Sequence, residues 1–119
     1  MYHIREVVLK SKTHIKKRPV IEFDDSEKAI VGEFLMVDAP LDDWDALDAI
    51  SEVLDGKVSK RHMSGNRCKI VMTAEKTYIY DLFSEAEGVP VFSDCMIETE
   101  TLRELMVMWK KEVKKYHKQ

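Results

Sequence analysis

Acidic side chains recur at three- and four-residue intervals between residues 45 and 55. Residues at this spacing share one face of a helix, so these acids would form a single stripe: Asp45, Asp48, Glu52 and Asp55. Each neighbouring like-charge pair destabilises a helix by about 0.2–0.5 kcal/mol, and residues 41–55 contain no lysine to offset the charge. The chemistry that this row offers is attraction of a cationic surface.

The same segment contains further residues typical of protein interfaces. Trp44 would lie at the border of the stripe, and large aromatic residues are enriched where interfaces bind most strongly. A solvated face, or one paired with basic segments of the same fold, is the alternative to a binding site, and the acidic segment 81–100 is a second candidate interface. The residues that we expect to bind a partner are Asp42, Asp43, Trp44, Asp45, Asp48, Glu52 and Asp55.

Residue patterns for catalysis or metal binding are missing from the sequence. There is no phosphate-binding glycine loop, dinucleotide fingerprint or zinc-protease motif. The histidines are too far apart to suggest a metal site. Cys68 would need a histidine beside it to act as a nucleophile, whereas its apolar neighbours indicate a core residue, as they do for Cys95. We therefore expect no enzyme activity, no cofactor and no metal.

The hydrophobic pattern predicts two helices that would position these residues. Over about 41–55, Leu47, Ile50 and Leu54 fall opposite the acids, and Gly56 suits the end of the helix. Over about 101–116, Thr101 and Glu104 form a capping-box pattern. The apolar stripe that follows predicts burial of Leu102, Leu105, Met106, Trp109 and Val113.

Strand patterns fill most of the remaining chain. The run 29–37 is apolar on both alternating faces, which predicts a central strand. Residues 10–18 are polar and basic and indicate a connector, and Gly65-Asn66 suits a hairpin turn. These elements predict an α+β fold, mainly an antiparallel sheet packed by two helices. The expected strands are 2–9, 19–23, 29–37, 57–63, 67–73, 77–83 and 91–97.

Length and composition limit the remaining possibilities. The chain has 119 residues, of which 45% are hydrophobic and 34% charged, so we expect one domain over 1–119. No apolar run is long enough to cross a membrane, no leader pattern is visible, and two cysteines cannot build a disulfide framework, which predicts a cytoplasmic protein. Residues 22–55 hold twelve acids and one base, Lys28. The basic stretch 12–18 lacks interleaved aromatic residues, so we expect no nucleic-acid partner.

The chain resembles the small cytoplasmic immunity proteins of bacterial contact-dependent and polymorphic toxin systems. The resemblance covers about two thirds of the chain and rests on strand and helix patterns: residues 32–38 leading into the Trp44 helix, 65–70, 78–83, and 95–99 with Leu102, Leu105 and Trp109. It implies an antidote that binds one cognate toxin, often a basic nuclease, and blocks its active site. A small ligand-binding or regulatory domain without catalysis, as a monomer or a dimer, is the alternative.

Overall fold

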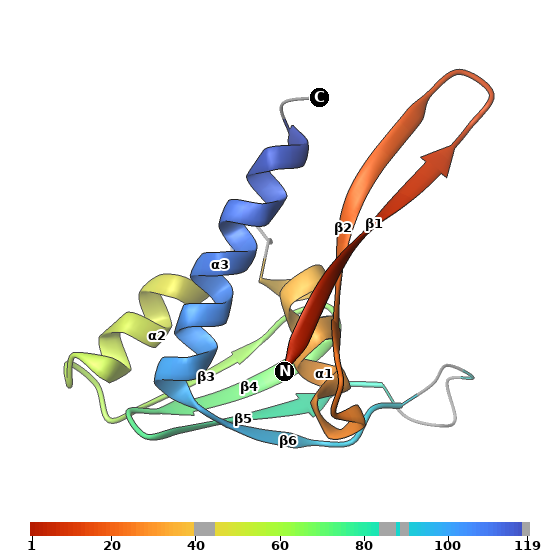
Figure 1. Cartoon of the computed structure of the whole chain (residues 1–119). Coiled ribbons are helices and arrows are strands. Elements are labelled where there is room, and N and C mark those ends of the chain that lie inside the picture. The colour runs from red at the N-terminus through yellow and green to blue at the C-terminus, as the bar shows by residue number, and fades with distance from the viewer. Residues whose placement is uncertain (40–44, 84–87, 89–90, 118–119) are drawn as a thin grey trace.

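A computed structural model of the chain shows an α+β fold, as predicted (Figure 1). It describes residues 1–39, 45–83, 88 and 91–117. Strands β1 (Tyr2–Lys10) and β2 (Ile15–Phe23) form a two-stranded antiparallel sheet. Strands β3 (Lys60–Ser64), β4 (Cys68–Thr73), β5 (Lys76–Asp81) and β6 (Cys95–Glu98) form a second antiparallel sheet in chain order. The helices lie on one face of this larger sheet, and the β1–β2 hairpin projects beyond it, beside α3 (Thr99–His117).

The apolar run at 29–37 is helical, so the prediction of a central strand there is wrong. A short 3-10 turn, η1 (Ser26–Lys28), leads into α1 (Ala29–Glu33) and the π-helical turn η2 (Phe34–Asp38). A run that is apolar on all sides fits a buried helix as well as a buried strand, and here the burial has helical spacing. The fully buried residues are Ile30, Val31, Phe34, Leu35 and Asp38.

The N-terminal hairpin is longer than predicted. Strand β2 begins at Ile15, so much of the basic segment 10–18 is strand rather than connector. Pro19 lies in the middle of β2, opposite Glu6 of β1. A proline is tolerated there because a two-stranded sheet consists of edge strands, in which one side of each backbone needs no partner.

Helix α2 (Ala46–Leu54) ends as predicted, but it begins at Ala46 rather than near residue 41 and faces the core through a different side. The Lys57 N–H donates to the Glu52 carbonyl (3.0 Å) and the Gly56 N–H to the Val53 carbonyl (3.2 Å), and Gly56 has a φ of 76°. These bonds form a Schellman motif, which ends the helix. Of the predicted core residues of this helix, only Ile50 is fully buried. The side of the helix that carries the small alanines packs closely against the core instead. The buried residues of α2 are Ala46, Ala49, Ile50 and Val53, while Leu47 and Leu54 are half-buried.

Helix α3 packs as its pattern predicted, although it begins earlier. It starts at Thr99, so Thr101 lies inside the first turn and the predicted capping box does not form the helix start. The Thr99 hydroxyl donates to the Thr73 carbonyl (2.6 Å) and lies 2.8 Å from the Thr77 hydroxyl oxygen, which ties this end of the helix to the sheet. Besides Thr99, its buried residues are Leu102, Leu105, Met106 and Trp109, whereas Val113, also predicted to be buried, is half-buried.

The four-stranded sheet buries alternate residues beneath the helices, which confirms the strand alternation predicted for this region. The expected strand at 91–97 is shorter than predicted, because only Cys95–Glu98 pairs with β5. The buried side chains of β4, β5 and β6 are Cys68, Ile70, Met72, Thr77, Ile79, Cys95 and Ile97. No helix in the described part of the chain is long and apolar enough to cross a membrane.

Candidate functional site: the acidic face of α2

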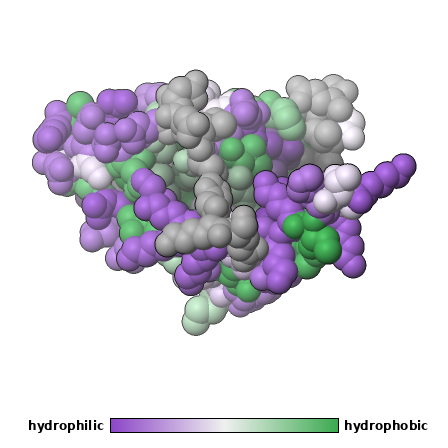
Figure 2. Space-filling view, turned by 90° about the horizontal axis from the view of Figure 1, so that it is seen from above, coloured by the Kyte–Doolittle hydropathy of each residue, from purple (hydrophilic) through white to green (hydrophobic). Residues whose placement is uncertain are grey.

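The acids of α2 lie on the side of the helix opposite its buried residues. Asp45, Asp48 and Asp55 are exposed, and Glu52 is half-buried. Figure 2 shows mainly hydrophilic side chains at the left end of the molecule, where α2 lies in Figure 1. The predicted stripe therefore forms, and we call these four residues the acidic face. The other three expected binding residues lie outside the described residues: Asp42, Asp43 and Trp44.

Asp45 has a structural role at the start of α2. Its side-chain oxygen Oδ1 accepts a hydrogen bond from the Asp48 N–H (3.3 Å), so Asp45 is the N-cap of the helix. A side-chain hydrogen bond with Asp45, together with the charge of Asp45, raises the pKa of Asp48 above its ordinary value. The charge of Glu52 acts in the same direction, whereas Lys110 of α3 opposes it. The ionised form of Asp48 is thus disfavoured by its acidic neighbours.

Cations from other elements offset part of the acidic face. Arg61 of β3 forms an ion pair with Glu52 (Nη1 to Oε2, 2.9 Å), and Lys110 lies close enough to affect Asp48. Although α2 itself contains no lysine, cations from β3 and α3 therefore lie near its acidic face. Within the described residues, Asp55 forms no ion pair. Asp48 and Asp55 remain the acids with the weakest structural roles.

The two cysteines are buried core residues, as predicted. Cys68 is fully buried and Cys95 is 9% exposed. Burial, followed by the negative charges of Asp38 and Asp81, raises the pKa of the Cys68 thiol, and burial likewise raises the pKa of Cys95. A nucleophilic cysteine needs the thiolate form, so this environment does not suit Cys68 for catalysis.

The loops at one end of the sheet are held by polar residues. The sequence patterns had not indicated these residues. The buried Asp38 carboxylate accepts hydrogen bonds from the N–H groups of Asn66 (2.8 Å), Arg67 (3.1 Å) and Cys68 (2.6 Å). It thereby fixes the β3–β4 hairpin, in which neither Gly65 nor Asn66 has a positive φ. A lone aspartate that ends an apolar run was the available signal for this role.

Arg67 and Asp81 form a second, largely buried polar contact. Arg67 Nη2 lies 2.8 Å from Asp81 Oδ2, and the guanidinium stacks near the rings of Phe83 and Phe92 at 4.4 and 5.1 Å. Burial by itself would raise the pKa of Asp81. The N–H groups of Phe92 and Phe83 and the Arg67 guanidinium outweigh burial, so the pKa is lowered. Both polar networks have a structural role in holding the loops together. The acidic face therefore remains the candidate binding site.

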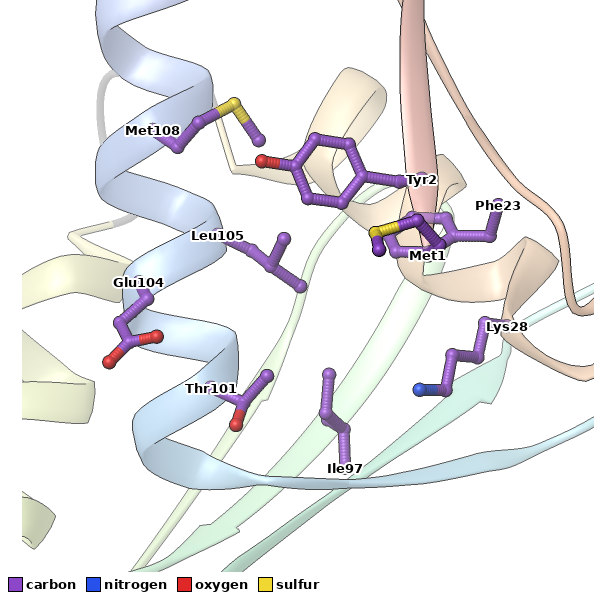
Figure 3. A pocket seen from close by; sticks show the side chains of 9 residues that line it. All are labelled: Met1, Tyr2, Phe23, Lys28, Ile97, Thr101, Glu104, Leu105 and Met108. Carbon is purple, nitrogen blue, oxygen red and sulfur yellow. The ribbon is translucent and has the colours of Figure 1, made fainter.

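A pocket of about 430 Å³ lies apart from this face, between α3 and the start of β1 (Figure 3). Its walls are mostly apolar, with Lys28 and Glu104 among its charged residues. Within the residues that the structure describes, no cluster of three or more His, Cys, Asp or Glu is arranged to hold a metal ion.

Comparison with known proteins provides no relative for the chain. No protein-family model, no curated protein and no solved structure matches it.

Proposed function

We propose that the protein acts by binding another protein, as an antidote that neutralises a basic toxin domain through the acidic face of α2. The toxin class follows from charge: a nuclease domain carries cations that hold nucleic-acid phosphates, and a row of carboxylates would attract the same cations. The observation that carries the proposal is the crowding of Asp45, Asp48 and Glu52, which raises the pKa of Asp48.

That crowding is unfavourable for the free protein. An ionised Asp48 repels Asp45 and Glu52, and the Lys110 charge opposes this only in part. A lysine or arginine of a partner placed beside Asp48 would favour its ionised form, so binding would relieve the repulsion. Glu52 is already paired with Arg61, and Asp45 caps the helix. We therefore propose Asp48 and Asp55 as the main contacts with the partner.

We place this activity in the cytoplasm. Cys68 and Cys95 are free thiols, each buried in the core, which is the usual state of cysteines in a reducing compartment. The proposed partner is a protein rather than a nucleic acid, because the acidic face repels phosphate.

The test is protection of a host cell. The product of the gene immediately upstream, as the candidate toxin, is expressed from an inducible promoter in a heterologous bacterium, with and without this protein. The proposal predicts that wild-type protein restores growth and that a variant with both Asp48→Asn and Asp55→Asn protects less well. A protein with Glu75→Gln, an exposed acid in the β4–β5 turn, is the matched control and should protect fully. Growth arrest that is the same with and without the protein would refute the proposal.

A further inference from the structure

The pocket beside α3 has apolar walls and one inward-facing cation. Leu105 and Met108 of α3 form one wall, Ile97 of β6 lies at the base, and Phe23 and Tyr2 of the hairpin form the other wall. The rings of Tyr2 and Phe23 contact each other at a centroid distance of 5.9 Å. This composition, apolar with a few polar groups, is typical of small-molecule sites, as is the volume of about 430 Å³.

Lys28 is the one cationic side chain among the lining residues that the structure describes. Figure 3 shows its side chain extending from η1 with the ammonium group directed into the pocket, towards Ile97 and α3. Within the described residues, Lys28 forms no ion pair, although Asp25 and Glu27 are on the same turn. Lys28 is half-buried, and apolar side chains beside a cation reduce the dielectric screening of its attraction for an anion.

The other polar groups of the pocket would set the orientation of a bound ligand. The Tyr2 hydroxyl is directed across the pocket towards Met108, whereas the Glu104 carboxylate lies on the far side of α3 from Lys28 and is directed away from it (Figure 3). An anionic group would therefore be attracted at the Lys28 end and repelled at the Glu104 rim. Between these two ends the lining is apolar except for Thr101 at the start of α3.

We infer that this pocket binds an amphipathic carboxylate, a molecule with an aliphatic body and one carboxylate head. The head lies at Lys28, and the body lies along Leu105 and Met108 towards the Tyr2 ring. The site is separate from the acidic face of α2, so this inference and the proposed function can fail independently.

Methionine methyl groups provide the test. The full-length protein labelled with ¹³C at the methionine methyls is titrated with decanoate below its micelle-forming concentration and followed by NMR. Met108 and Met1 line the pocket, with Met1 largely exposed at its mouth, while Met96 is exposed on β6, away from the pocket lining. We expect saturable shifts of the Met1 and Met108 signals and none at Met96. No saturable shift, or shifts at Met96 as large as those at Met108, would overturn the inference.

The charge of Lys28 is tested with a neutral ligand of the same length. Lys28→Gln should weaken decanoate binding by about tenfold, the usual cost of losing one charged contact, and leave decanol binding unchanged. Lys69→Gln, which removes an exposed lysine of β4, should change neither affinity. An equal loss for decanoate and decanol would contradict the proposed carboxylate contact. Met108→Trp, which fills the pocket, should abolish binding of both ligands, and unchanged binding would show that the pocket is not the site.

Discussion

The carboxylate of Asp38 accepts a hydrogen bond of 2.6 Å from the backbone N–H of Cys68, 30 residues further along the chain. The N–H groups of Asn66 and Arg67 converge on the same carboxylate. One buried side chain thus joins the end of η2 to the hairpin between β3 and β4. A buried acceptor that satisfies three backbone donors is costly to lose, because each donor would otherwise be left without a partner.

Asp38→Asn should therefore destabilise the fold while nearly preserving side-chain shape. The new amide group can accept through one oxygen only and places an NH₂ beside backbone donors, so we expect a loss of about 3 kcal/mol in the free energy of unfolding. Urea denaturation measures it. Asp94→Asn removes an exposed acid and should change stability by less than about 0.5 kcal/mol. Equal stability of the two variants would show that Asp38 does not anchor the hairpin.

The ion pair between Arg67 and Asp81 makes stability depend on pH. Asp81→Asn leaves the largely buried guanidinium without its counter-charge and should cost about 3–5 kcal/mol at pH 7. Because the pKa of Asp81 is lowered in the folded protein, the wild-type advantage is complete above the unfolded pKa of about 3.9 and is lost as pH falls through the folded value. Urea midpoints of both proteins from pH 7 to pH 3 test this. An advantage that stays constant over the whole range would contradict the assignment.

Both thiols should be unreactive in the native protein. Burial raises the pKa of Cys68 and of Cys95, which lowers the thiolate fraction and excludes reagents. With Ellman's reagent at pH 8, we expect slow labelling without denaturant and rapid labelling of two thiols per chain in urea. Rapid stoichiometric labelling of the folded protein would show that a cysteine is accessible.

Trp109 joins α3 to the core and is 4% exposed. Trp109→Ala should reduce stability by about 3–5 kcal/mol, because it removes the largest side chain of the helix stripe and leaves a cavity. Thermal and urea unfolding measure the loss. Met108→Ala, at a half-buried neighbouring position, should cost less. An unchanged melting temperature for Trp109→Ala would show that α3 is not packed as described.

The sequence predicted the α+β class, the two amphipathic helices and the position of the acidic face, because periodicity and helix-stop chemistry are local signals. It failed at residues 29–37, where an apolar run fits either a helix or a strand, and burial by tertiary packing decides between them. It also missed the cations at Arg61 and Lys110 that approach the acidic face, because charge compensation across elements depends on the folded arrangement. The role of Asp38 was likewise hidden, since its three donors lie in another hairpin.

Asp48→Asn should leave the free protein as stable as wild type or slightly more stable at pH 7. The acid's raised pKa shows that its ionised form is disfavoured in the fold, so the variant removes repulsion. The difference should vanish at acidic pH, where Asp48 is protonated in the folded and unfolded states alike. Urea unfolding at pH 7 and at pH 3 tests the sign. A clear loss of stability at pH 7 would mean that Asp48 is a structural ion-pair partner of Lys110.

Calorimetric titration of this protein with the purified product of the gene immediately upstream, at low and at high salt, tests directly whether the acidic face of α2 binds a basic partner. We expect saturable binding that weakens with salt, and a dissociation constant about tenfold or more higher for the variant with both Asp48→Asn and Asp55→Asn, while Glu75→Gln binds like wild type. The absence of binding, or equal affinity of the wild type and the Asp48→Asn, Asp55→Asn variant, would contradict the acidic face of α2 as the binding site.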